Sequence, residues 1–166
     1  VTIEVGARIN SRQQLMISPD MDREEIVDLI REKRAVHPVA DLALYAFRDM
    51  SQCAWEPFVK AALERCPVSL DMCANMSIKQ AYTWLLDMPS TSIYDAQRLA
   101  QPDEVVNFKT GDGLEKAFVL ANVIRHHRPT LALEIQARGE QVSLIGPDRV
   151  YTFSTSKGLD LVLNIP

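Results

Sequence analysis

The stretch Gly111-Asp112-Gly113-Leu114-Glu115-Lys116-Ala117 sets the fold expected for this 166-residue chain. Asp112 and Glu115 stand at the N-cap and N3 positions of a capping box, which predicts a helix from Asp112 to about His126. Apolar residues repeat at helical spacing along it and form an inner stripe of Leu114, Ala117, Phe118, Ala121 and Ile124. We therefore expect this helix to pack its stripe against a second layer of structure.

After Pro129 the spacing of apolar residues changes from the helical period to a period of two. This alternation predicts four strands, over residues 130–137, 140–145, 149–153 and 159–164. Arg138-Gly139 separates the first two strands and is typical of a hairpin turn. The chain should therefore end in an antiparallel sheet that packs on the preceding helix.

The first 76 residues are predicted to be mainly helical. After a short strand at Thr2–Val5, helices are expected over Asp22–Ala35, Val39 to about Met50, and about Ala54 to Arg65. The first helix opens with a capping box of Asp22 and Glu25. Pro67 should end the third helix, and residues 68–72 are predicted to be either a strand or a plain connector.

The fold class that follows is α+β, with a helical N-terminal lobe over residues 1–76 and a core over residues 77–166. The two parts either stay separate or form one compact domain. A second capping box, Ser77 with Gln80, opens a helix that runs to about Asp87. Residues 92–110 have mixed character, and Pro102-Asp103 is interpreted as a break within them.

Composition excludes several classes of function. The chain is 47% hydrophobic and 24% charged, with a formal net charge of −4 and no block of like charge, so we expect no nucleic-acid partner. No apolar run approaches the roughly 18 residues that span a bilayer. Because the chain begins at Val1 rather than Met, it is expected to be a processed product or part of a larger polypeptide, and export stays open.

The cysteines and histidines predict neither a disulfide framework nor a metal site. Three cysteines (Cys53, Cys66 and Cys73) are an odd number without close pairs, which favours reduced thiols and a cytoplasmic setting. His126 and His127 are adjacent, so they point about 100° apart on a helix and cannot bind one ion from one face. The acids between Asp20 and Glu25 suit a helix start and lack the spacing of a calcium loop. We expect no metal and no cofactor.

One family resemblance spans Ser77 to about Phe153. The matching features are an Ala-Tyr-x-Trp helix face, an Ile-Tyr-Asp segment, and a Gly-Asp start followed by an apolar helix; they comprise Ala81, Tyr82, Trp84, Ile93, Tyr94, Asp95, Gly111, Asp112, Ala117 and residues 118–125. In this order they resemble the transglutaminase-like (papain-like cysteine) superfamily. That family opens its buried helix with Gly-x-Cys-x-Asp-x-Ala.

The resemblance implies a fold whose chemistry has been lost. Gly113 stands at the place of the family's nucleophilic cysteine, and Glu115 stands at its acidic place. The histidine base would come from the first strand after the helix, yet residues 131–135 contain none. The family mechanism needs both the thiolate and the base. The resemblance therefore implies a catalytically inactive domain.

Three functions follow from these observations. The first is an inactive transglutaminase-like module that binds a protein or an extended peptide in a groove whose candidate residues are Trp84, Tyr94, Asp95, Asp112, Gly113 and Glu115. The second is a cysteine-type amidase or hydrolase that uses a displaced thiol with His126 or His127. The third is a purely structural module. Gly113 itself is interpreted either as a site of close packing or as a small hollow above the helix N-terminus.

Overall fold

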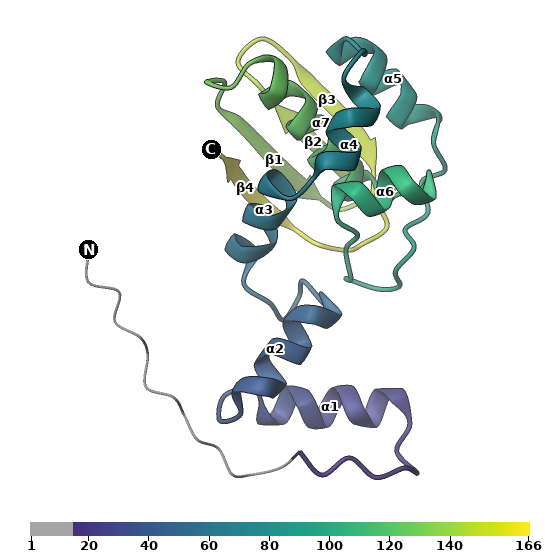
Figure 1. Ribbon diagram of the computed structural model, residues 1–166, viewed down its shortest axis with the longest axis vertical. Helices are drawn as coiled ribbons and strands as arrows, with labels where there is room; N and C mark the ends of the chain where they lie inside the picture. Colours follow the sequence, from purple (N-terminus) through teal and green to yellow (C-terminus); the bar gives the residue numbers. More distant parts are fainter. Residues whose placement is uncertain (1–14) are drawn as a thin grey trace, which may run out of the picture. The chain divides into compact units, whose positions relative to one another are not determined.

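A computed structural model describes residues 15–166, so the strand predicted at Thr2–Val5 lies outside the described residues. The contacts divide the chain into two compact units, Val1–Arg48 and Asp49–Pro166. Figure 1 shows the helices first along the chain and the four strands at its C-terminal end. The predicted α+β class is confirmed. The division falls between Arg48 and Asp49.

The first unit contains a pair of helices, α1 (Arg23–Lys33) and α2 (Pro38–Phe47). The predicted capping box at the start of α1 is confirmed: the Glu25 N–H donates to Asp22 Oδ1 over 2.9 Å, and the Asp22 N–H donates to Glu25 Oε2 over 3.0 Å. Helix α1 has no buried residue, and α2 buries Ala40 and Leu44. The start of α1 is therefore stabilised by its capping box, and burial in a core contributes little to this helix.

The second unit holds the core. Its helices are α3 (Trp55–Glu64), α4 (Pro67–Cys73), α5 (Ile78–Asp87), α6 (Pro102–Phe108) and α7 (Gly113–His127). Its strands are β1 (Leu133–Arg138), β2 (Gln141–Ile145), β3 (Val150–Ser154) and β4 (Leu161–Ile165). Helix α7 packs against β1, β2 and β3 and also against α3 to α6, so it forms the centre of the unit (Figure 1).

Burial extends around the whole circumference of α7. Every residue from Gly113 to Ile124 is buried. The inner stripe expected from the sequence was too narrow, because α7 is covered by the sheet and by the other helices of the unit. A helix buried on all sides must bury its polar residues too, and these need partners inside the protein.

The sheet is antiparallel throughout, in the order β3-β2-β1-β4. The hairpin between β1 and β2 was predicted; its turn is Gly139-Glu140, closed by the pair Arg138 and Gln141. Gly139 has a φ of 56°, a value that suits glycine at the first position of a two-residue turn. Strand β4 pairs with β1 rather than β3, so the connection from β3 to β4 crosses one end of the sheet.

Two helices were not predicted. Residues 68–72 are neither strand nor connector but part of α4, and Pro102 begins α6 instead of breaking the chain. Pro67 begins α4 and Pro102 begins α6. In the first turn of a helix the N–H group that proline lacks would have no partner within the helix, so its absence costs nothing there. The start of α4 is capped from a distance: Asp103 accepts the N–H groups of Val68 and Ser69 over 3.1 and 2.8 Å.

Within residues 15–166, no helix combines the length and the apolar character that crossing a membrane requires.

Candidate functional site at the start of helix α7

The site residues predicted from the sequence gather only in part. Asp112, Gly113 and Glu115 lie together at the first turn of α7, and all three are buried. Tyr94 and Asp95 lie in the long loop between α5 and α6, which covers that turn. Trp84 lies on α5, half-buried against the hydrophobic core.

Asp112 is the N-cap of α7 and also the anchor of the β3–β4 connection. Its side chain accepts the Leu114 N–H over 2.9 Å, as a helix cap does. It also accepts the Thr155 hydroxyl over 2.6 Å and the Ser156 N–H over 2.8 Å. The carboxylate is fully buried and therefore depends on these donors in place of water.

Glu115 holds the long loop against the helix. Its Oε1 accepts the Ser92 hydroxyl over 2.6 Å and the Ala100 N–H over 2.7 Å, and its Oε2 accepts the Asp112 N–H over 2.8 Å. The last bond completes the predicted capping box. Burial raises the pKa of the Glu115 carboxyl, and the three hydrogen bonds together with the charge of Lys157 partly offset that effect.

Two buried lysines complete the cluster, and neither was among the predicted site residues. Lys157 Nζ lies 3.9 Å from Glu115 Oε1 and donates to the carbonyls of Tyr94 and Arg98 over 2.9 and 2.5 Å. Lys116 Nζ donates to the Met88 carbonyl over 2.7 Å. Burial lowers the pKa of both ammonium groups. The one signal near them in the sequence is the hydroxyl-rich run of Ser154, Thr155 and Ser156 directly before Lys157.

Each charged group of the cluster forms hydrogen bonds with backbone or hydroxyl groups of this chain, so the cluster holds segments of the fold together. Four charged side chains tie the loop after α5 and the β3–β4 connection to the first turn of α7: Asp112, Glu115, Lys116 and Lys157. Tyr94 strengthens the same loop, since its hydroxyl donates to Glu104 over 2.8 Å and its ring lies 4.5 Å from the Arg98 guanidinium. Asp95 lies at the surface and pairs with Arg98 over 3.3 Å.

Gly113, the first residue of α7, packs directly against the end of β3. A Cβ atom placed on it would lie 2.2 Å from the Ser154 carbonyl oxygen and 2.8 Å from Phe153 Cβ. The hollow considered above the helix N-terminus is therefore filled by the strand backbone, and the structure favours the close-packing interpretation of this glycine. A peptide has no room there, so the groove predicted at Asp112, Gly113 and Glu115 is closed.

Two of the three thiols and the two adjacent histidines give little support to the enzymatic alternative, while the third thiol, Cys53, is partly exposed. Cys66 and Cys73 are buried, and burial raises the pKa of both thiols, whereas a catalytic thiol needs a lowered pKa. The Cys66 thiol donates to the Leu63 carbonyl over 3.5 Å. His127 Nε2 lies 3.1 Å from the Met76 carbonyl oxygen, and His126 is exposed.

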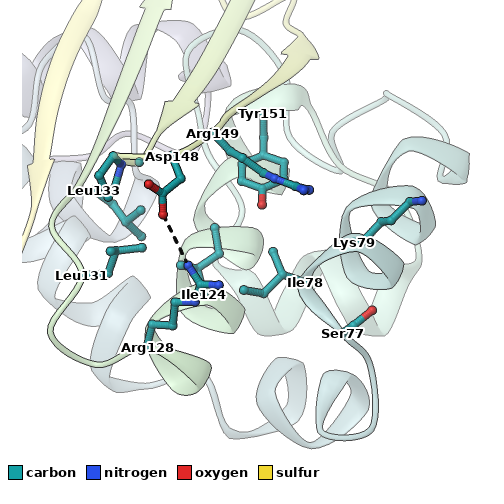
Figure 2. A pocket seen from close by; sticks show the side chains of 12 residues that line it. Ser77, Ile78, Lys79, Ile124, Arg128, Leu131, Leu133, Asp148, Arg149 and Tyr151 are labelled. Carbon is teal, nitrogen blue, oxygen red and sulfur yellow. Dashed lines mark ion pairs between the residues drawn. The ribbon is translucent and has the colours of Figure 1, made fainter.

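The second unit has two further hollows that could hold a ligand. One groove of about 640 Å³ lies between α3 and β4. A second cavity of about 470 Å³ lies where the start of α5, the end of α7 and the β2–β3 turn meet (Figure 2). Among the described residues, no group of three or more histidine, cysteine or acidic side chains is arranged to hold a metal ion.

Comparisons with protein-family models, with curated proteins and with solved structures found no match to this chain.

Proposed function

We propose that this chain is a non-enzymatic, transglutaminase-like binding module that holds an extended segment of a partner protein in the groove between α3 and β4. Two observations argue against catalysis. Gly113, at the position of the family's nucleophile, is buried and packs against the backbone of β3. The carboxylates of Asp112 and Glu115 beside it already accept hydrogen bonds from this chain. The binding site proposed here is the groove between α3 and β4, and not the first turn of α7 where we expected it from the sequence.

The observation that carries the proposal is the unpaired edge of β4 beside an apolar groove. In residues 15–166, β4 pairs only with β1, and its other edge has no strand partner. The unpaired N–H and C=O groups of such an edge are satisfied by adding a further strand, which is how many proteins bind extended peptides. A helical or compact partner would leave these groups unpaired.

The walls of the groove suit a peptide with alternating apolar side chains. Trp55, Val59 and Leu63 form its helical side, and Val162 and Leu163 form its strand side. Val162 is 50% exposed, so a bound strand would bury apolar surface there. Successive side chains of a strand point to opposite faces, and alternate residues of the peptide would therefore enter the groove.

Arg125 offers a polar contact within the same groove. Its Nε atom is buried and has no hydrogen-bond partner among the described residues. An unsatisfied buried donor costs about 1–3 kcal/mol, and a peptide carbonyl or carboxylate could accept from it. The other charged residues of the groove, Glu56, Lys60 and Glu64, leave it close to neutral when counted with Arg125. Apolar contact and backbone pairing should therefore dominate the affinity.

The test is to select short peptides from a displayed random library on the full chain, and then to measure binding and amide hydrogen exchange. Selected peptides should protect those amides of residues 161–165 whose N–H groups point away from β1. Val162→Lys should weaken their binding by about tenfold or more, because a lysine on the edge opposes strand addition. The matched control is Val150→Lys, since Val150 is 57% exposed on the opposite edge strand and lies outside the groove.

Two results would contradict the proposal. Selected peptides could bind the Val162→Lys variant as tightly as the parent chain, or they could leave the β4 amides unprotected. A dimer that forms through β4 without any peptide would make a second copy the occupant. The non-enzymatic part is tested separately by iodoacetamide: Cys66 and Cys73 should react more slowly than a free thiol, because their pKa values are raised.

A further inference from the structure

A second cavity lies on the same unit but shares no lining residue with the α3–β4 groove. Its volume is about 470 Å³, within the range of sites that bind small molecules. Figure 2 shows residues of the β2–β3 turn and of β3 on one side, with Ile78 and Lys79 of α5 across from them. Two helices (α5 and α7), two strands (β1 and β3) and the β2–β3 turn contribute lining residues, so the cavity is formed by the tertiary structure and not by a single motif.

The inner wall of the cavity is apolar. Ile124 and Leu133 are buried, and Ile78 and Leu131 are half-buried, all four lining the same space. These side chains come from α5 (Ile78), from α7 (Ile124), from the α7–β1 connection (Leu131) and from the first residue of β1 (Leu133). They offer a hydrocarbon surface to the non-polar part of a ligand.

The rim of the cavity is cationic. It carries Lys79, Arg128 and Arg149 against a single carboxylate, Asp148, which gives 3 − 1 = +2 on a chain whose formal charge is −4. Arg128 and Asp148 face each other over 3.8 Å, as the dashed line in Figure 2 marks, and partly neutralise one another. The surplus positive charge is therefore that of Lys79 and Arg149.

Several donors on this rim are unused by the protein. Within residues 15–166, the side chains of Lys79 and Arg149 and the hydroxyl of Tyr151 make no hydrogen bond or ion pair. The Tyr151 ring is held in place by an edge-to-face contact with Tyr82, with centroids 5.0 Å apart. A fixed hydroxyl and two free cations beside an apolar wall form a site for an anion that carries a non-polar group.

From this arrangement we propose that the cavity binds a small organic phosphate monoester. The phosphate carries a charge of about −1.5 to −2 at neutral pH, which matches the surplus charge of the rim. Arg149 and Lys79 pair with the phosphate oxygens, and the Tyr151 hydroxyl donates to the same group. The organic part of the ester lies against Ile78, Ile124, Leu131 and Leu133.

Isothermal titration calorimetry on the full chain with phenyl phosphate tests the proposal. Binding should be saturable, and it should be at least about fivefold tighter than binding of inorganic phosphate or of phenol, since each of these lacks one half of the recognised chemistry. Lys79→Gln and Arg149→Gln should each weaken it about tenfold, and Tyr151→Phe should weaken it by a few fold. All three positions are at the surface or half-buried, so circular dichroism should report an unchanged fold.

The matched control is Arg138→Gln, because Arg138 is an exposed arginine of the same sheet that does not line the cavity. It should leave the affinity for phenyl phosphate unchanged, and so should Val162→Lys, which separates this site from the α3–β4 groove. Absence of saturable binding would overturn the proposal. So would equal binding of inorganic phosphate, or an equal loss in Arg138→Gln and Arg149→Gln, since these results indicate only general attraction to positive charge.

Discussion

Helices α1 and α7 begin with the same pair of residue types and reach opposite environments. Asp22 with Glu25 and Asp112 with Glu115 both form a complete capping box. Helix α1 has no buried residue, whereas every residue of α7 from Gly113 to Ile124 is buried. A local motif therefore determines where a helix begins, but it does not determine what the helix packs against.

The difference in burial changes what the two carboxylates do. In the exposed box, Asp22 and Glu25 compete with water for their hydrogen bonds, so each bond contributes little. In the buried box, the carboxylates also accept from Ser92, Ala100, Thr155 and Ser156. Substitution of either carboxylate would leave the donors that it accepts from without a partner inside the protein. We therefore expect substitutions in the α7 box to reduce stability more than those in the α1 box.

The largest effect is expected at Gly113, the first residue of α7. Gly113→Ala places a methyl group 2.2 Å from the Ser154 carbonyl oxygen, and the strand backbone cannot yield cheaply. We expect a loss of about 3 kcal/mol or more in the free energy of unfolding, measured by urea denaturation. Gly139→Ala is the matched control: it has no atom within 4 Å and a φ of 56°, so it should cost only about 1 kcal/mol. Equal losses in the two variants would contradict the close packing of α7 on β3.

The next effect is expected at Asp112, the N-cap of α7. Asp112→Ala removes a cap worth about 1 kcal/mol and leaves the buried Thr155 hydroxyl and the part-buried Ser156 N–H without their acceptor, for a total of about 3 kcal/mol. A double variant with Thr155→Val should lose less than the sum of the two single variants, because the second change removes a donor that the first has already left unpaired. Additive losses in the double-mutant cycle would argue against the coupling.

A pH-dependent effect is expected at Glu115. Because burial raises its folded-state pKa above the ordinary value of 4.5, its contribution to stability is largest below that value and falls as the pH rises through the folded-state pKa. The stability deficit of Glu115→Gln relative to the parent chain should therefore be greatest at about pH 4 and shrink toward about pH 8, as followed by urea denaturation. A deficit that grows with pH would mean that the hydrogen bonds and Lys157 outweigh burial.

The smallest effect is expected in the exposed box. Asp22→Ala should cost about 1 kcal/mol, confined to the first unit, because only the cap of α1 is lost. Amide hydrogen exchange should show faster exchange in α1 and unchanged protection in α7. A loss as large as that of Asp112→Ala would break the comparison between the two boxes.

The sequence alone determined the features that depend on neighbours within a few residues. The capping boxes at Asp22, Ser77 and Asp112 were predicted at the correct residues, and the hairpin was predicted with its turn one residue too early. Each depends on contacts between residues at most three or four apart, which the order of residue types reports directly. The order of helices before strands, and therefore the α+β class, followed from the spacing of apolar residues, which changes from the helical period to a period of two after Pro129.

Only the tertiary structure decided the features that depend on distant partners. The start of α4 is capped by Asp103, a residue 35 positions away, and the cap of α7 bonds Thr155, which is 43 positions away. The sequence could not reveal that α7 is covered on every side, nor that Gly113 meets the backbone of β3. These features arise when separate elements pack together, because burial turns an ordinary cap into a network that must satisfy every charged group inside the protein.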